Sequence, residues 1–322
     1  MPLAAAGSTG TRQVRPSQKE MLGRFLEAYW LRPENALWMT LRSEALAQCT
    51  FDRPSADLCC GDGIFSFLHH GGLFDPAFDV FWPSAALPEG ADTRADMFDH
   101  VTDDYRPPIR YPAPTTIDLG TDVKPAFLTK AGRLKLYGQL VQQDHNHALP
   151  WPPGTFQTVH CNAAYWLTNI EGFLAELRRI VAPGGKVILQ VKLDSFHRYS
   201  LARNHRQLGD RFLERIIGHR LDSWPTLASR AVWESRFEAA GLVIDRETPF
   251  TAKTHMQIWE IGLRPIAPLL MKMANGIGSS SRAAIKRDWV ALILDLAEPF
   301  CQPEFTLSDT TAEPGEIQYV LV

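Results

Sequence analysis

Asp57-Leu58-Cys59-Cys60-Gly61-Asp62-Gly63 is the stretch that decides the fold. The residues before it, Ala56-Asp57-Leu58, predict the end of a buried strand, and residues 64–68, Ile-Phe-Ser-Phe-Leu, predict the start of a helix. A turn from strand to helix requires glycine where the backbone adopts a positive φ or must come close to a ligand. The stretch therefore predicts a βα turn beside a ligand site.

The glycine spacing narrows the kind of ligand site. A Gly-x-Gly loop also opens the G-x-G-x-x-G nucleotide sites, but Ser66 stands here in place of the third glycine. The stretch resembles the first motif of the class I S-adenosylmethionine (SAM)-dependent methyltransferases. That resemblance implies a loop under the methionine end of SAM and an acid, Asp57, that orders the loop and reaches the ligand. Cys59 stands where this family usually has its first glycine.

Two acids follow at the ends of further predicted strands. Residues 122–131 read Asp-Val-Lys-Pro-Ala-Phe-Leu-Thr-Lys-Ala and resemble the second motif of the family. Its acid accepts hydrogen bonds from the ribose hydroxyls, a task that suits a carboxylate. Residues 140–144 predict a strand ending in an acid, which in the family usually accepts a hydrogen bond from the adenine amino group. The resemblance therefore implies that Asp122 holds the ribose and Asp144 the adenine.

The distance between the glycine loop and Asp122 leaves an alternative open. Asp122 comes 59 residues after Gly63, whereas about 20 residues separate the corresponding groups in other nucleotide-binding βαβ units. Asp79 has the ordinary spacing, but no similar helix follows it. We therefore expect an insertion over residues 69–114, whose aromatic residues argue for an ordered flap: Phe74, Phe78, Phe81, Trp82, Phe98 and Tyr105.

The clearest periodic segment covers residues 173–189. Its apolar positions predict one face of a helix, Pro183-Gly184-Gly185 ends that helix, and residues 187–189 predict a buried strand. In the family this unit is a helix, its turn and the fifth strand. The resemblance covers about residues 55–69 and 115–194. It implies an α/β, Rossmann-like fold, with a seven-stranded, mostly parallel sheet, helices on both faces and an antiparallel last strand.

Composition excludes several classes of protein. The chain has 322 residues, 45% hydrophobic and 21% charged, and a net charge of −3 without a dense run of Lys or Arg. A nucleic-acid substrate favours a basic stripe, so we expect no nucleic-acid partner. No stretch approaches the roughly 18 apolar residues of a transmembrane segment. Five cysteines without metal-site spacing or an even framework indicate a reducing compartment, and we expect a cytoplasmic protein.

The chain divides into a core with additions at both ends and within it. Residues 242–244 predict the sixth strand and residues 317–322 the last one. An apolar run over residues 258–271 is compatible with a lid, a homodimer surface, a lipid-facing patch or simple core packing, and we expect a substrate wall. The expected organisation is a flexible tail (1–17), an N-terminal helical cap (18–50), the SAM-binding core (51–251) with the insertion 69–114, a helical insertion (252–303) and a C-terminal strand region (304–322).

Methyl transfer from SAM mainly requires alignment of the acceptor with the methyl carbon. A hydroxyl acceptor usually also needs a general base, and open α/β sheets place their sites past the carboxyl ends of the strands. His160, with Asn162 and Tyr165, is the candidate there, and Asp194 with His197 is the alternative. For each histidine, packing is the alternative explanation, and it is the one that residue statistics favour. His145 and His147 lack a third ligand, so we expect no metal.

The resulting hypothesis is an enzyme with SAM as its cofactor and a small molecule as its acceptor. O-methylation of a biosynthetic intermediate, such as a sugar or a polyketide, is the leading reaction. N-methylation follows, and then C-methylation of a lipid or isoprenoid. A non-catalytic assembly partner that kept the fold is the alternative from another class. The expected cofactor contacts are Asp57, Cys59, Gly61, Gly63, Asp122, Asp144, His145 and Cys161.

Overall fold

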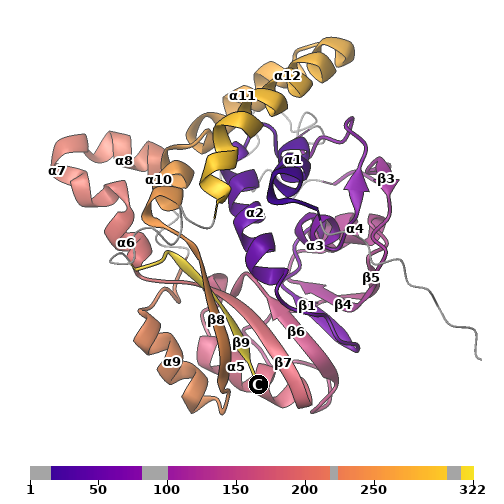
Figure 1. Ribbon diagram of the computed structural model, residues 1–322, viewed down its shortest axis with the longest axis vertical. Helices are drawn as coiled ribbons and strands as arrows, with labels where there is room; N and C mark the ends of the chain where they lie inside the picture. The colour runs from indigo at the N-terminus through magenta and orange to yellow at the C-terminus, as the bar shows by residue number, and fades with distance from the viewer. Residues whose placement is uncertain (1–15, 82–100, 218–223, 303–312) are drawn as a thin grey trace, which may run out of the picture.

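The structure is a computed structural model that describes residues 16–81, 101–217, 224–302 and 313–322 (Figure 1). Nearly all of the expected flexible tail lies outside the described residues. The same holds for Trp82 and Phe98 of the insertion and for residues 304–312 of the C-terminal region.

The core is one seven-stranded sheet. The strand order across it is β5-β4-β1-β6-β7-β9-β8. All strands run parallel except β9, which is antiparallel to both of its neighbours, β7 and β8. This confirms the predicted mostly parallel sheet with an antiparallel last strand. Across the sheet the strands are β5 (Tyr137–Gln142), β4 (Ile117–Asp122), β1 (Ser55–Leu58), β6 (Phe156–Cys161), β7 (Val181–Lys192), β9 (Glu316–Leu321) and β8 (Ile244–Thr251).

β8, the sixth strand of the seven-stranded sheet in chain order, lies later in the sequence than predicted. Leu242 is buried just after a helix, whereas β8 begins at Ile244 and continues to Thr251. This strand forms the edge of the sheet, where polar residues and Pro249 are tolerated because one side of the backbone has no strand partner. Because residues 244–251 have only a weak apolar pattern, the more apolar residues 242–244 were predicted as the strand instead.

Helices cover both faces of the sheet. On one face, α5 (Ile170–Ile180) and α9 (Arg230–Ala239) pack against β1, β6, β7 and β9 around the fully buried Trp233. Asn169 caps α5 by accepting a hydrogen bond from the Gly172 N–H. On the other face lies α3 (Ile64–His69) with the N-terminal helices. Helix α4 (Pro125–Arg133) follows β4 and begins with proline, which suits the first turn of a helix.

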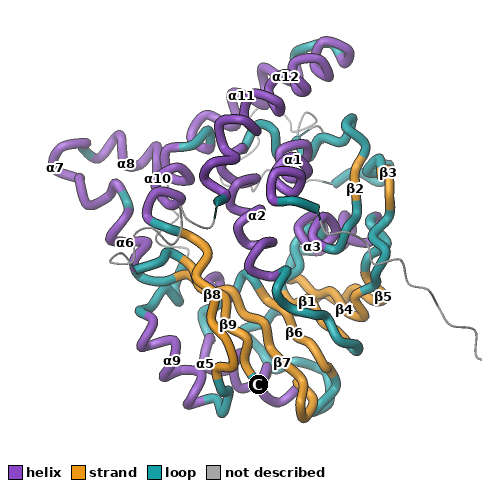
Figure 2. The backbone as a smooth tube through the Cα atoms, viewed as in Figure 1, coloured by secondary structure: helices purple, strands orange, loops and turns teal. Residues whose placement is uncertain are grey.

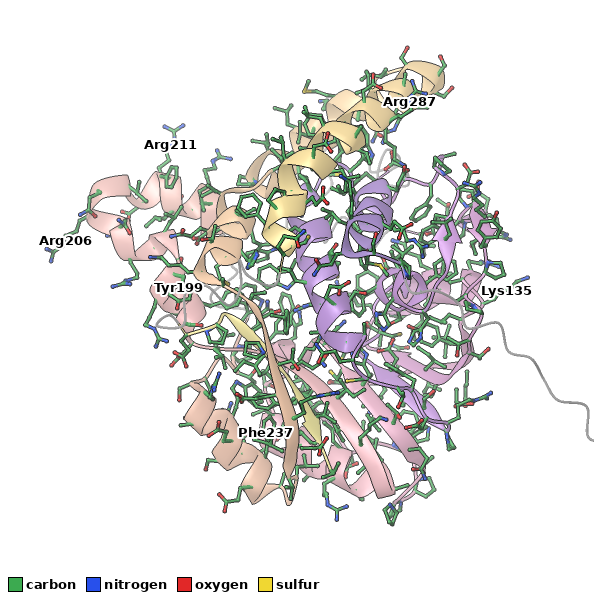
Figure 3. All side chains as sticks on the ribbon, in the orientation of Figure 1. Lys135, Tyr199, Arg206, Arg211, Phe237 and Arg287 are labelled. Carbon is green, nitrogen blue, oxygen red and sulfur yellow. The ribbon has the colours of Figure 1, made fainter. Side chains whose placement is uncertain are left out.

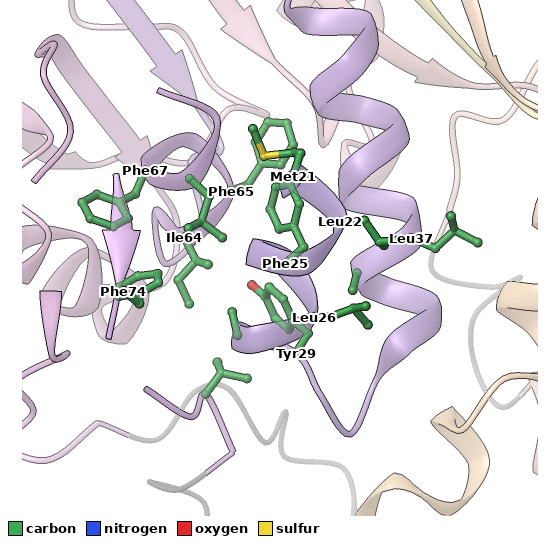
Figure 4. Packing of buried hydrophobic residues seen from close by; sticks show 14 of the residues in the cluster. Met21, Leu22, Phe25, Leu26, Tyr29, Leu37, Ile64, Phe65, Phe67 and Phe74 are labelled. Atoms are coloured by element: carbon green, nitrogen blue, oxygen red, sulfur yellow. The ribbon is translucent and has the colours of Figure 1, made fainter. Parts of the chain in front are cut away.

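The predicted N-terminal cap is a pair of helices, α1 (Gln18–Ala28) and α2 (Pro33–Leu46). Ser17 and Glu20 form a capping box at the start of α1. Figure 4 shows Met21 and Phe25 of α1, and Tyr29 just after it, facing Ile64 and Phe65 of α3, and the Phe25 and Phe65 rings stack at 6.0 Å. The two helices therefore pack directly over the helix that follows the glycine loop.

The described part of the insertion is held in place by the C-terminal helices. β2 (Leu73–Phe74) and β3 (Ile109–Tyr111) pair antiparallel at its base. Asp79 accepts hydrogen bonds from Arg282 of α12 (Ser279–Ala297) and from the indole N–H of Trp30. The alternative alignment is therefore wrong. Asp79 links Trp30, in the turn after α1, to Arg282 of α12, and it is β4, with Asp122, that pairs with β1.

The remaining helices gather near the carboxyl ends of the central strands, above the sheet in Figures 1 and 2. No helix among the described residues is long and apolar enough to cross a membrane. These elements are η3 (Ala164–Trp166), α6 (Ser195–Tyr199), η4 (Leu201–Asn204), α7 (His205–Leu208), α8 (Asp210–Ile217), α10 (Lys253–Ile261), η5 (Arg264–Ile266), α11 (Ala267–Asn275) and η6 (Glu298–Cys301).

Candidate active site

The glycine loop follows β1 and uses the left-handed backbone region three times. Cys59 has φ 57°, Gly61 has φ 60° and Gly63 has φ 77°. A Cβ on Gly61 would meet nothing closer than a Phe127 ring carbon at 4.0 Å, so open space lies above it. Gly63 instead faces packed side chains within 3.2 Å. Gly61 therefore marks the part of the loop that a ligand can approach, and Gly63 the part that supports it.

Asp122 ends β4 and reaches across to this loop. One carboxylate oxygen accepts the Gly61 N–H at 3.0 Å and the other accepts the Lys124 N–H at 2.9 Å. A carboxylate has about four acceptor positions, so capacity remains for ribose hydroxyls. Burial raises the pKa of Asp122, although the two backbone N–H groups act in the opposite direction. A carboxylate beside an open glycine loop fits the ribose of SAM.

Asp144 and His145 follow β5 and occupy different layers of the site. Asp144 is partly exposed and accepts hydrogen bonds from the backbone and side chain of Asn146, at 2.9 and 3.0 Å. His145 is buried, with Nε2 2.8 Å from the Thr121 hydroxyl and Nδ1 3.4 Å from the Cys59 sulfur. Burial lowers the pKa of His145 to about 4, so its ring is neutral near pH 7. His145 therefore supports the loop from behind, whereas Asp144 remains accessible.

Asp57 belongs to the core, and this corrects the expectation that it reaches the ligand. It is only 2% exposed and contacts three protein partners. Its carboxylate accepts the Ser66 hydroxyl at 2.6 Å and the Tyr137 hydroxyl at 2.7 Å, and lies 2.8 Å from Nδ1 of His160. Burial raises the pKa of Asp57, but these partners outweigh it and the pKa lies below its ordinary value. Asp57 therefore joins α3, β5 and β6 beneath the loop.

His160 is enclosed in the same network, which corrects its assignment as the catalytic base. Its exposed fraction is zero, because β1 and β7 flank it in the sheet and the Phe51 and Phe65 rings pack beside it. An enclosed imidazole cannot take a proton from an acceptor. Cys161, a predicted cofactor contact, is likewise fully buried, and its hydrogen bond with Cys59 is the main reason that the pKa of the Cys59 thiol lies well above its ordinary value.

Of the other candidates, Tyr165 lies in a cluster that the sequence did not reveal. Asn162 is half-buried in the turn after β6, while Asp194 is partly exposed and pairs with Arg198. We call the cluster that contains Tyr165 the aromatic box. Its rings surround the Lys192 ammonium at the carboxyl end of β7, with ring centres at 4.0 Å (Trp38), 4.4 Å (Phe196), 4.6 Å (Tyr165), 5.0 Å (Trp224) and 5.9 Å (Trp259).

The counter-ion of the aromatic box is Glu316, the first residue of β9. Its carboxylate accepts the Trp38 indole N–H at 3.0 Å, two N–H groups of Arg42 at 3.1 and 3.2 Å, and the ammonium of Lys192. All of these side chains are buried. Figure 3 labels Tyr199 of α6 beside this region, where its hydroxyl donates to the Glu313 carbonyl at 2.5 Å.

One signal for this cluster was present in the sequence. Residues on one side of a strand alternate, so Lys192 shares the side of Ile188 and Gln190. That side is covered by α2, because Gln190 donates to the Arg42 carbonyl. A cation that ends a buried strand on a covered side requires buried partners, and this pattern points to Lys192.

The two glycines of the loop should respond differently to alanine. Gly61→Ala introduces only the strain of a left-handed side chain, about 1–2 kcal/mol. Gly63→Ala adds contacts at 3.1–3.2 Å with Leu134, Ala131 and Tyr137, and overpacking costs a further 1–3 kcal/mol or so. Urea denaturation should therefore show a larger loss of unfolding free energy for Gly63→Ala. SAM affinity should fall in Gly61→Ala despite its smaller loss of stability. Equal losses of stability would contradict the two roles.

Residues 115–189, from just before β4 to within β7, match the family described as "Methyltransferase domain". No curated protein matches the sequence significantly. The matched segment contains both Asp122 and Asp144.

Solved structures give remote likenesses over most of the chain. One chain from the complex between the Haloferax volcanii Trm112 methyltransferase activator and a methyltransferase is 15% identical, with a TM-score of 0.46, and the match covers 96% of this chain and 98% of that one. A SAM-dependent methyltransferase from Geobacter sulfurreducens, solved with S-adenosyl-L-homocysteine, is 12% identical, with a TM-score of 0.42 and coverages of 94% and 97%.

Proposed function

Because the chain carries a class I SAM-dependent methyltransferase domain, we propose that it methylates a hydroxyl group of a small-molecule acceptor, a biosynthetic intermediate such as a sugar or a polyketide. One observation supports this most. The glycine loop with Asp122 and the aromatic box lie at the same carboxyl edge of the sheet. Tyr165, four residues after the end of β6, belongs to the box, and β6 pairs with the strand that leads into the loop.

The cofactor side consists of groups that hold and orient. Asp122 accepts hydrogen bonds from the ribose hydroxyls, and Asp144 accepts one from the adenine amino group. Gly61 lets the backbone approach the ligand. Bound SAM would supply an electrophilic methyl group, so that the acceptor oxygen would displace S-adenosyl-L-homocysteine, whose sulfur keeps the electron pair, and the hydroxyl proton would pass to water. The contribution of the protein is mainly alignment.

On the acceptor side, we assign the effect on the acceptor hydroxyl to two cations and not to the predicted histidine. His160 is enclosed, so it does not remove the acceptor proton. Arg42 and Lys192 bring two positive charges to the aromatic box, with Glu316 between them. Nearby cations favour the ionised form of a hydroxyl, because opposite charges lower its pKa. Tyr165, partly exposed at the rim of the box, is the residue proposed to contact the acceptor.

We also propose a cytoplasmic location. All five cysteines are free thiols, and three of them, Cys59, Cys60 and Cys161, gather at the glycine loop and the end of β6. Free thiols persist in reducing compartments. A homodimer stays a prediction.

Titration calorimetry and product release test the proposed function in sequence. The full chain should bind both SAM and S-adenosyl-L-homocysteine. A panel of hydroxyl compounds, each paired with its amine analogue, should then release S-adenosyl-L-homocysteine from the hydroxyl members only. Release from the amines alone would replace O-methylation with N-methylation. Absence of binding by either cofactor form would contradict methyl transfer altogether.

A further inference from the structure

We propose that the aromatic box is the acceptor subsite and that it takes a planar aromatic acceptor bearing an acidic group, such as a phenolic carboxylate. This inference rests on the proposed function and names its substrate class. The box combines rings from four elements, α2, η3, α6 and α10, with Trp224 of the segment that precedes α9. Its position at the carboxyl end of β7 is where open α/β sheets bind ligands.

The walls of the box favour a flat, apolar body. Trp38, Phe196 and Trp224 are buried, whereas Tyr165 and Trp259 are partly exposed and form the accessible rim. The rings meet at varied angles, including an edge-on contact of Tyr165 with Trp224 at 5.9 Å. Aromatic side chains bind planar rings by stacked and edge-on contacts, so the walls of the box suit a flat aromatic body.

The polar groups of the box favour an acid. Arg42, Lys192 and the indole N–H of Trp38 are donors, and all three bond the carboxylate of Glu316. Four hydrogen bonds use up the roughly four acceptor positions of that carboxylate. Glu316 is therefore a saturated acceptor and leaves nothing for a further donor.

The buried indole N–H of Trp224 is a further feature that points to a bound ligand group. It is 5% exposed, and its indole N–H has no hydrogen-bond partner among the described residues. Buried donors in native proteins are almost always paired. The N–H belongs to a wall of the box, on a ring 5.0 Å from the Lys192 ammonium. A ligand group that only accepts hydrogen bonds and carries negative charge satisfies the Trp224 donor and suits the neighbouring cations.

The test uses the three tryptophans of the box as reporters. Tryptophan fluorescence of the full chain, saturated with S-adenosyl-L-homocysteine, is titrated with 4-hydroxybenzoate and 4-hydroxycinnamate and with their neutral methyl esters. Each acid and its ester share one ring and one hydroxyl, so a difference in affinity reports the acidic group. We expect at least one acid to bind tenfold or more tightly than its ester.

Variants assign that preference to residues. Trp224→Phe removes the N–H and keeps an aromatic wall without breaking a bond among the described residues, and it should weaken acid binding about tenfold while leaving ester binding nearly unchanged. Lys192→Met should have a larger effect. Lys186→Met is the control, because Lys186 lies on the same strand but bonds Thr50 and Asp52 outside the box. If Lys192→Met does not fold, Trp224→Phe and the acid–ester comparison still decide.

The outcomes separate this inference from the proposed function. Equal binding of acids and esters, or an unchanged acid affinity in Trp224→Phe, would overturn the acidic acceptor. If S-adenosyl-L-homocysteine binds normally in those experiments, the proposed function survives. If calorimetry finds no binding of S-adenosyl-L-homocysteine, it is the proposed function that fails.

Discussion

Glu316→Ala should lower the free energy of unfolding by about 3–5 kcal/mol, the usual loss when one partner of a buried ion pair is removed. The side chain of Glu316 is almost fully buried and pairs with two cations, Arg42 and Lys192, which are themselves buried. Without the carboxylate, both positive charges stay in a water-poor environment with no counter-ion from β9. Urea denaturation of the purified chain measures the loss.

A matched control distinguishes burial from the mere loss of an ion pair. Glu247, on the neighbouring strand β8, pairs with Arg230 at 3.0 Å, and both side chains are more than a third exposed. Glu247→Ala should therefore cost no more than about 1 kcal/mol, as exposed pairs do. If both variants lost the same stability, the cluster around Glu316 would not be the buried ionic centre described above.

The pH dependence of this effect has a definite sign. Burial raises the pKa of Glu316, but Arg42 and Lys192 outweigh it, so the folded-state pKa lies below the ordinary value of 4.5. A lowered folded pKa contributes stability above the unfolded pKa, and that stability disappears as the pH falls through the folded pKa. The difference in stability between wild type and Glu316→Gln should therefore be largest near neutral pH and shrink well below pH 4.5.

Asp122→Ala should weaken SAM binding roughly ten- to a hundredfold, because each lost charge-assisted hydrogen bond costs about 1.5–3 kcal/mol. The variant loses the proposed ribose contact and also the bond that holds the Gly61 N–H at 3.0 Å. Titration calorimetry with SAM measures the change. The effect should be concentrated in cofactor affinity, since Asp122 lies at the carboxyl end of β4, next to the loop.

Two other aspartates provide comparison variants for this prediction. Asp118, on the same strand, pairs with Arg53 away from the loop, so Asp118→Ala should leave SAM affinity unchanged. Asp79→Ala should loosen the clamp between Trp30 and Arg282 and lower stability. If Asp79→Ala abolished SAM binding and Asp122→Ala did not, the assignment of the ribose acid would be wrong.

Local patterns in the sequence determined the core of the fold. Residues 56–68 predicted a strand, a turn and a helix, and the structure has β1, the glycine loop and α3 there. Strand and helix periodicities involve neighbours only a few residues apart, so they are visible in one sequence. Asp122 and Asp144 were predicted as cofactor contacts from the resemblance of residues 122–131 and 140–144 to family motifs, and these roles stay predictions.

Only the tertiary structure decided which side chains are accessible and which of them gather at the carboxyl end of β7. His160 has the sequence position of a catalytic base, but Asp57 and the packing over it enclose its ring. Glu316 meets Lys192 across 124 residues and Trp38 across 278. No local period connects such positions, because burial depends on which distant segment packs over a strand. The aromatic box around the buried Lys192 exists only because α2, α6 and α10 pack together over the end of β7.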